Sequence, residues 1–458
     1  TQEAPPRSPS PPGTAASGAT SPGGGDRAGR ERAVVLDVVA DLSPGSDDRS
    51  YLEGMELAVR AVNARGGVRG RPLELALHDH RGDPGRAARL IAGLARRGAR
   101  AVLYVGPGGA LLRAREALLA AETPVVLLEG DLYTGRKLFL PVFQATVPWA
   151  WQAHELARYL VRDRRVRRVG FLGVGPEARP GAAVLRQALR YWGGDLARWA
   201  AVPTPNVPAA GGSPGAGPLP RAVESLVGGL ARAGPGPAAL VVLGPPDPAA
   251  AAARAAAELA RRDGPPLRVV SASSLLAGPE EGLLPGTAAV YVHTWAGWAE
   301  PVPRVHRFRR AFLRATGRLP AGFEQEGYDA VRVLAWGLER TGGRGGRRLV
   351  EALEGARDLV FSGFPVDLGP DDHLFAPRDE LGLFALPGPR EGLDPWQRRG
   401  GPRWRPVMRT FTYDGRRTNV IERDRRAFFP GWRKGRPAPP YWRSRYGITT
   451  RPRADPLH

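Results

Sequence analysis

Apolar and polar residues along this chain alternate with two periods, one typical of strands and one typical of helices. The run AVVLDVVADL, which starts at Ala33, is apolar enough to predict a buried strand. The next segment carries apolar residues at steps of three, four and three, at Leu52, Met55, Val59 and Val62. This spacing predicts one apolar face of a helix. Gly66 and Gly67 predict the end of that helix, because glycine tolerates the left-handed conformation that terminates helices.

The alternation runs through most of the chain and restarts after a break at Pro148 and Trp149. Before the break, strands are predicted at 73–77, 101–105 and 124–128, and helices at 86–97 and 110–121. After it, strands are predicted at 167–174, 238–244, 267–272 and 288–295, and helices at 182–192, 249–262, 304–316 and 325–340. This order predicts an α/β fold of two similar units, each a mainly parallel sheet flanked by helices. The last helices are expected to return and cover the first unit.

Length and composition narrow the class of protein. With 458 residues the chain suits two or three domains, and its 42% apolar content is enough to build cores. The absence of cysteine excludes disulfides, thiolate zinc sites and cysteine nucleophiles. No apolar run approaches the ~18 residues that a membrane helix needs. No nucleophile elbow, phosphate loop or dinucleotide fingerprint occurs in a fitting context, so we expect no enzyme activity and no cofactor.

Two segments have the composition of irregular chain. Residues 1–31 are rich in Pro, Ser, Gly and Ala, as in SPSPPGTAASGATSPGGG, and have no apolar face to bury. They predict a disordered tether, such as a protein anchored at the cell surface would need, with an inert terminus as the alternative. The stretch PTPNVPAAGGSPGAGP at 203–218 predicts a surface loop.

The net charge of +21 suggests binding to nucleic acid, but the types and positions of the basic residues weaken this interpretation. Lys137 and Lys434 are the only lysines among 66 basic residues, a skew that a GC-rich genome would produce. More than half of the net charge lies in residues 390–458, where arginines are interleaved with Trp, Phe and Tyr. This C-terminal extension could contact nucleic acid, anionic lipid or a cell-wall polymer, or it could wrap the body with its aromatic residues inward, which we favour. Within it, FTYDGRRTNVI predicts a hairpin with Asp-Gly at its turn.

A polar cluster follows the second predicted strand, at His78, Asp79, His80 and Asp83. Residues 78 and 80 of a strand share one face, and two imidazoles with a carboxylate can bind zinc. Spacing alone therefore leaves a metal site open.

Four stretches in the same order resemble the type I periplasmic substrate-binding proteins, the branched-chain amino acid binding family of ABC transporters. The first, GMELAVRAVNARGGVRGRPLELALHDHRGDP from Gly54, is similar to the family's helix, tight turn and strand. The others are LYVGPGGALLRA at 103–114, EGYDAVRVLAWGLE at 326–339, and LVEALEGARDLVFSGFPVDLGPDDHLF at 349–375. Together they place the resemblance over roughly 33 to 388.

The resemblance implies two lobes joined by crossing strands. Lobe 1 would comprise 33–145 plus 297–358, and lobe 2 would comprise 146–296 plus 359–388. The crossings would fall near Gln144–Trp151, Val292–Gly297 and Val360–Val366. The resemblance also implies that the acidic cluster after the second strand forms a turn and holds no metal.

In open α/β sheets, ligands bind beyond the carboxyl ends of the strands, next to helix N-termini. The candidate ligand-binding residues in the corresponding loops are Ser43, Gly108, Gly109, Ala110, Gly130, Asp131, Tyr133, Glu177, Asp247 and Ser273. The loop GPGGA at 106–110 would meet a ligand carboxylate with backbone N–H groups, or it is a helix entry without a ligand. Trp149, Trp151 and Trp295 lie at the expected crossings, where Trp149 and Trp295 could form a wall of the ligand site or simply pack the hinge.

The candidate site departs from the family pattern, because Gly109, Ala110 and Gly130 stand where amino-acid binders usually offer hydroxyls. Ser273 aligns with the acidic residue that grips the ligand ammonium, and Asp131 or Glu177 could substitute for it. The resemblance thus implies a monomeric, extracytoplasmic protein that binds a small polar solute, such as an amino acid or amide, and serves an ABC permease. The alternatives are a ligand-sensing domain of a signalling system, or a basic protein that binds nucleic acid or an envelope polymer.

Overall fold

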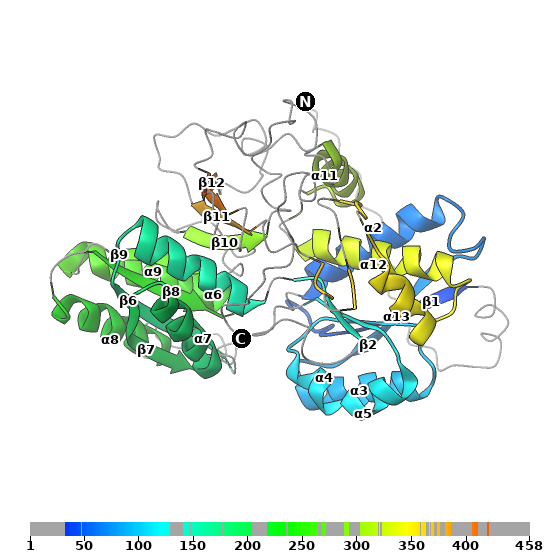
Figure 1. Ribbon diagram of the computed structural model, residues 1–458, viewed down its shortest axis with the longest axis horizontal. Coiled ribbons are helices and arrows are strands. Elements are labelled where there is room, and N and C mark those ends of the chain that lie inside the picture. The colour runs from blue at the N-terminus through cyan, green and yellow to red at the C-terminus, as the bar shows by residue number, and fades with distance from the viewer. Residues whose placement is uncertain are drawn as a thin grey trace, which may run out of the picture.

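A computed structural model describes the fold of the chain between residues 33 and 420. The described residues are 33–46, 48–128, 141–146, 148–175, 178–203, 218–234, 237–244, 246–263, 267–271, 288–292, 303–318, 320, 323–357, 359–362, 366, 368–370, 373–375, 381–385, 405–410 and 419–420. The predicted tether, the predicted loop at 203–218 for all but its two end residues, and the predicted Asp-Gly turn lie outside them. Two sheets, each with its own helices, form two lobes that stand side by side in Figure 1.

The sheet of lobe 1 has five parallel strands in the order β2-β1-β3-β4-β5. The strands are β1 (Val34–Ala40), β2 (Leu73–Asp79), β3 (Val102–Tyr104), β4 (Val125–Leu127) and β5 (Val142–Gln144). Their side chains alternate between the two faces, as the pleat of a strand requires. Val38 packs under one set of helices, while its neighbour Val39 packs under the other.

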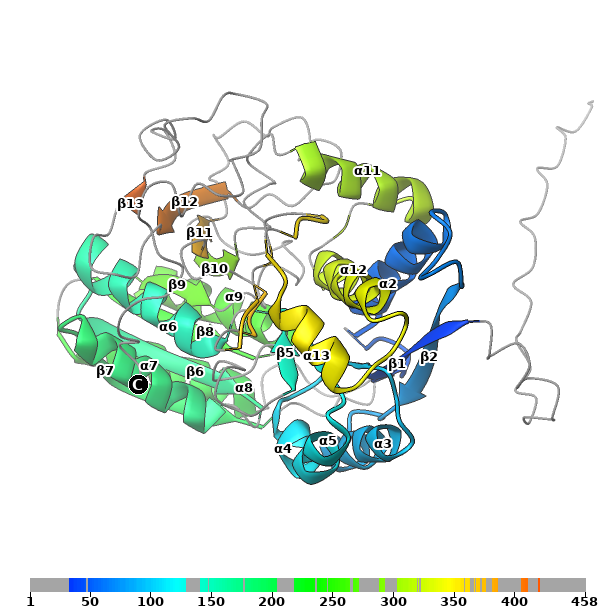
Figure 2. The ribbon, with the colours of Figure 1, turned by 45° about the vertical axis from the view of Figure 1, so that its right-hand side comes forward.

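Six helices cover the two faces of this sheet, and a seventh, α11, packs alongside. One face carries α2 (Asp48–Asn63), α12 (Phe323–Arg340) and α13 (Arg347–Glu354). The opposite face carries α3 (Pro84–Arg96), α4 (Gly109–Arg113) and α5 (Arg115–Ala121). The two sets are separated by the sheet in Figure 2. The helix α11 (Pro303–Thr316) packs next to α2. The expected return of late helices to lobe 1 is therefore present.

The sequence Asn-Ala-Arg-Gly-Gly forms the link between α2 and β2, and its asparagine and glycines have specific structural roles. The Asn63 side chain donates to the Leu73 carbonyl at 2.9 Å and accepts from the Leu73 N–H at 2.7 Å, which fixes the helix end to the strand start. Gly66 and Gly67 have φ of 95° and 73°, a region that residues with a Cβ rarely adopt. The chain reverses between Val68 and Arg71 before β2 begins.

The sheet of lobe 2 has eight strands in the order β13-β12-β11-β10-β9-β8-β6-β7. The parallel strands are β6 (Arg168–Val174), β7 (Asp195–Val202), β8 (Ala238–Leu243), β9 (Leu267–Ser271) and β10 (Ala288–Val292). The antiparallel strands are β11 (Leu381–Ala385), β12 (Arg405–Thr410) and β13 (Asn419–Val420). Part of the C-terminal extension thus extends this sheet, while its contact with an anionic surface stays a prediction. The predicted α/β class with mainly parallel sheets is confirmed.

The helices of lobe 2 pack in pairs on its sheet. They are α6 (Trp149–Arg158), the π-helix η2 (Tyr159–Asp163), α7 (Ala178–Tyr191), α8 (Pro218–Arg232) and α9 (Pro246–Asp263). α6 packs beside α7, and α8 packs beside α9, over one continuous apolar core. Among the described residues, no helix combines the length and the apolar character that spanning a bilayer requires.

The chain crosses between the lobes where β5 and the segment 373–375 run side by side. The Gln144 N–H donates to the His373 carbonyl, and the Phe375 N–H donates to the Gln144 carbonyl, both at 2.9 Å. Leu374 packs in the core of lobe 2, whereas Phe375 and Leu368 pack in the core of lobe 1. Leu368 thus packs in lobe 1 although it follows residue 359, where the lobe 2 segment was expected to begin. The expected residue ranges of the lobes stay a prediction.

Several elements differ from the sequence-based expectation. The single helix expected at 110–121 is two helices, because Ala114 departs from helical geometry at φ −88° and ψ 0°. The strand β7 was not predicted, since it lies at the sheet edge with most of its residues exposed and so lacks an apolar period. The helix α8 begins next to a Pro- and Gly-rich stretch, and β5 has only three residues, so neither gives a clear signal.

Candidate functional site

The loop after β1 is shaped by two aspartates that accept backbone N–H groups. The Asp41 N–H donates to Asp48 Oδ2 at 2.7 Å, and the Leu42 N–H donates to Asp79 Oδ1 at 3.1 Å. The bond from Leu42 is the largest of the causes that hold the pKa of Asp79 below its usual value. Ser43, a predicted ligand residue, lies exposed in this loop. The bond from Leu42 to Asp79 connects the carboxyl ends of β1 and β2.

The polar cluster after β2 is engaged in the structure of the turn. His78 Nε2 lies 2.8 Å from Asp37 Oδ1. The Asp83 carboxylate caps α3 by accepting from the Gly85 N–H at 2.7 Å. Asp79 accepts from the Leu42 and Arg81 N–H groups. Within the described part of the chain, no three His, Asp or Glu side chains gather as a metal ion would require.

The glycine loop after β3 is folded against a tyrosine. The Tyr104 hydroxyl donates to the Pro107 carbonyl at 3.1 Å. Gly106 has φ 148°, and a Cβ there would lie 2.5 Å from the Tyr104 hydroxyl oxygen, so the turn needs glycine at this position. Gly108 and Ala110 are buried, whereas Gly109 is exposed and a Cβ added to it would meet nothing within 4 Å.

The same loop contains backbone N–H groups that the described part of the chain does not use. Among the described residues, none accepts a hydrogen bond from the N–H groups of Gly108 or Gly109. The Ala110 N–H is already used, since it donates to the Pro107 carbonyl at 3.1 Å. This part of the predicted site therefore offers two N–H groups and no side chain.

On lobe 2, Trp149 begins α6 and lies in the core. Its indole Nε1–H donates to the Gly181 carbonyl at 3.0 Å, and its ring lies 6.3 Å from that of Phe171. The side chain is buried at 3% exposure. These contacts explain the residue as packing between α6 and α7, one of the two roles expected for it, and its role as a ligand wall stays a prediction.

Trp149→Phe is expected to lower the free energy of unfolding by about 1–2 kcal/mol, because it removes one buried hydrogen bond and some packed volume. The comparison variant Trp199→Phe should change it by less than about 0.5 kcal/mol, because Trp199 is 41% exposed on β7. Urea unfolding followed by circular dichroism measures both. Equal losses for the two variants would contradict the burial of Trp149.

Of the remaining predicted ligand residues, the structure places only the backbone of one. Asp247 falls in the first turn of α9. The others lie outside the described residues: Gly130, Asp131, Tyr133, Glu177, Ser273 and Trp295. All of them stay predictions.

Sequence reasoning missed one contact at the expected hinge. Asp329 on α12 accepts from the Ser362 N–H at 3.0 Å and lies 2.6 Å from the Ser362 hydroxyl. The Gln325 amide donates to the Ser362 carbonyl at 3.1 Å. Burial is the largest cause that raises the pKa of Asp329, to about 7. The family-like sequence Tyr-Asp-Ala marked this helix, but nothing marked Ser362 as its partner.

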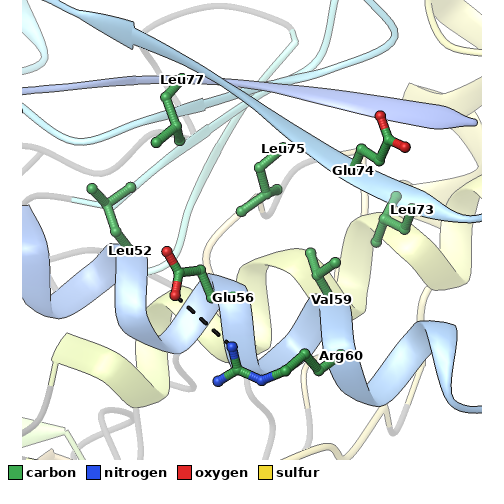
Figure 3. Close-up of a pocket in the computed structure, with 8 residues that line it drawn as sticks. All are labelled: Leu52, Glu56, Val59, Arg60, Leu73, Glu74, Leu75 and Leu77. Carbon is green, nitrogen blue, oxygen red and sulfur yellow. Dashed lines mark ion pairs between the residues drawn. The ribbon is translucent and has the colours of Figure 1, made fainter. Parts of the chain in front are cut away.

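A separate apolar groove of about 460 Å³ lies between α2 and the edge strand β2 (Figure 3). Leu52 and Val59 of α2 face Leu73, Leu75 and Leu77 of β2 across it. Glu56, Arg60 and Glu74 complete its lining. It lies beside the sheet rather than beyond the carboxyl ends of the strands, so it is distinct from the predicted ligand site.

Comparison with known proteins agrees with this architecture. A family model described as periplasmic binding protein matches residues 38–377. No curated protein matches the chain. A periplasmic binding protein type 1 from Bordetella pertussis Tohama I has a similar structure, with a TM-score of 0.64 and 18% identity over 82% of this chain and 100% of that one.

Two other similar structures are complexes with an amino acid. One is an ABC transporter substrate-binding protein from Desulfitobacterium hafniense in complex with Leu, with a TM-score of 0.60 and 18% identity over 82% of this chain and 99% of that one. The other is LivJ from Streptococcus pneumoniae in complex with isoleucine, with a TM-score of 0.57 and 15% identity over 78% of this chain and 96% of that one. At these identities the likeness concerns the fold. Because the family model spans most of the chain and includes strands of both sheets, this protein belongs to the type I periplasmic binding protein family.

Proposed function

We propose that this protein is an extracytoplasmic solute-binding protein that captures a small polar ligand between its lobes and delivers it to an ABC importer. Family membership and the two-sheet fold support this proposal. The observation that carries it is the glycine loop at the end of β3, where the N–H groups of Gly108 and Gly109 have no acceptor among the described residues and the Cβ position of Gly109 is open. Ligands of open α/β sheets bind at such strand ends.

The chemistry of this loop favours a ligand with a carboxylate or carbonyl oxygen. Backbone N–H groups bind oxygen acceptors, and charge on the acceptor strengthens the bond. Since Gly109 and Ala110 carry no hydroxyl, the ligand would be held in lobe 1 through its oxygen atoms and the shape of the loop. Amino acids, amides and short peptides meet this requirement.

The proposed mechanism is closure of one lobe on the other around the ligand. The ligand binds one lobe first, contacts the second lobe, and shifts the population from open to closed. The crossing at Gln144 and Leu374, together with the bonds between Asp329 and Ser362, would serve as the hinge. No bond is made or broken, and a permease would recognise the closed form.

We also propose that the N-terminal segment tethers the protein to the outer face of the membrane.

A thermal-shift experiment with L-leucine, L-glutamine, acetamide and alanyl-alanine tests the function. A ligand at 100 times its Kd should stabilise the folded protein by about 2.7 kcal/mol, which raises its Tm. Gly109→Leu should keep the Tm of the free protein, because the site of the new Cβ is open, but should lose the shift by filling the loop. The control Leu112→Ala, at a side chain 51% exposed on the same helix, should keep the shift.

Two outcomes would count against the proposal. If none of the four probes shifts the wild-type protein, a small polar solute of these classes is not its ligand. If Gly109→Leu responds as the wild type does, the ligand is bound elsewhere.

A further inference from the structure

His80 follows β2 and connects three loops at the carboxyl edge of the lobe 1 sheet. The side chain is buried, with the ring edge towards Tyr104 at a centroid distance of 6.1 Å. Its Nδ1 accepts from the Gly82 N–H at 3.1 Å, within its own turn. Its Nε2 lies 3.0 Å from the Val105 carbonyl oxygen, in the residue just before Gly106. The same Nε2 lies 3.8 Å from Asp48 Oδ2.

These contacts define which nitrogen carries the proton. A backbone N–H can only donate, so Nδ1 must present its lone pair to Gly82. The hydrogen of the neutral ring is then on Nε2, which donates to the Val105 carbonyl. The ring is therefore a fixed link from the turn at Gly82 to the start of the glycine loop.

The Val105 carbonyl is well placed to control that loop. The Val105 N–H is held by the Val39 carbonyl at 3.0 Å, so the strand side of the residue is fixed by β1. Beyond it, the chain turns at Gly106 and reaches Gly108 and Gly109, whose N–H groups have no acceptor among the described residues. The bond from His80 holds the peptide at which this turn begins, and the Tyr104 hydroxyl holds its far side at Pro107.

We propose that His80 is a positioning residue for ligand binding, which sets the orientation of the glycine loop through its Nε2–H bond to the Val105 carbonyl. This inference rests on the proposed function of the loop. It assigns the effect on ligand binding to Nε2 alone. The bond from Gly82 to Nδ1 supports only the turn. His80 itself does not touch the ligand.

Two substitutions of His80 distinguish the roles of its two ring nitrogens, because each keeps one of the two hydrogen bonds and removes the other. His80→Gln can place an amide N–H near the Nε2 position, so it keeps the bond to Val105 and loses the acceptor for Gly82. His80→Asn can place its carbonyl oxygen near Nδ1, so it keeps the bond from Gly82 and loses the one to Val105. Each variant loses one buried hydrogen bond, so the Tm should fall by similar amounts in both.

Hydrogen exchange of the full chain without ligand is the first measurement. In His80→Asn, the peptide covering 104–112 should exchange about tenfold faster than in the wild type, while in His80→Gln it should stay within about threefold, since one lost bond of about 1.4 kcal/mol changes an opening equilibrium tenfold. Titration with the best probe among L-leucine, L-glutamine, acetamide and alanyl-alanine should show about a tenfold higher Kd for His80→Asn and little change for His80→Gln.

The outcomes separate this inference from the proposed function. Selective effects of His80→Asn on loop exchange and on Kd support it. Equal effects of the two variants overturn it, because a purely structural histidine would not distinguish its nitrogens. A wild-type protein that binds no probe argues against the proposed function, while loop exchange still decides whether His80 holds the loop.

Discussion

Gly54→Ala is expected to lower the free energy of unfolding by about 3 kcal/mol, at the upper end of the usual cost of overpacking. A Cβ at Gly54 would lie 1.8 Å from the Glu324 carbonyl oxygen, which is backbone and cannot move aside as a side chain could. The contact is reciprocal, since a Cβ at Gly327 would lie 2.2 Å from the Tyr51 carbonyl oxygen. The helices α2 and α12 thus meet backbone to backbone, and an added methyl group must push them apart.

The control for this prediction is Gly109→Ala, because a Cβ at Gly109 meets nothing within 4 Å. In an open helical position, alanine is favoured over glycine by about 1 kcal/mol, so this variant should keep or slightly raise the stability. Urea unfolding of both variants gives the comparison. The close approach of α2 and α12 would be refuted if Gly54→Ala were as stable as Gly109→Ala.

Acidification from about pH 8 to about pH 5 is expected to stabilise the wild-type protein by about 2 kcal/mol through Asp329. Burial raises the pKa of this carboxyl from 3.8 to about 7, against the opposing effect of Ser362 and Arg332. The folded protein therefore holds this proton more tightly than the unfolded chain. The resulting stability is fully present below about pH 4 and is lost as the pH rises through about 7.

Urea unfolding at a series of pH values, for the wild type and Asp329→Asn, isolates this contribution from other titrating groups. The amide can still accept from the Ser362 N–H and donate to its hydroxyl, so the variant should fold but lose this part of the pH dependence. The exposed Asp195, changed to Asn, serves as the matched control variant. A profile for Asp329→Asn that is parallel to that of the wild type would refute the titration of Asp329.

The same bond connects α12 to Ser362, which lies in an expected crossing. Ligand affinity should therefore be measured at one fixed pH when variants are compared. Otherwise a change in the protonation of Asp329 could be mistaken for a change in the ligand site.

The order of strands and helices could be predicted from the sequence because the spacing of apolar residues within one element shows its type and its buried face. Val38 and Val39 face opposite layers in the structure, and the long apolar run AVVLDVVADL already required a strand buried on both sides. The end of α2 could also be predicted from the sequence, since Gly66 and Gly67 adopt the positive φ that glycine tolerates. The family-like stretches added the arrangement into two lobes.

Contacts between distant segments were decided by the tertiary structure alone. Nothing in the sequence distinguishes Gly54 from other helix residues, although α12 packs against it. Nothing in the sequence marks Ser362 as the partner of Asp329. Spacing alone left a zinc site at His80 open, whereas the two nitrogens of its ring contact Gly82 and Val105. Sequence patterns report which face of an element is apolar. Which atoms meet across that face depends on packing between elements tens to hundreds of residues apart, and a single sequence carries no signal for it.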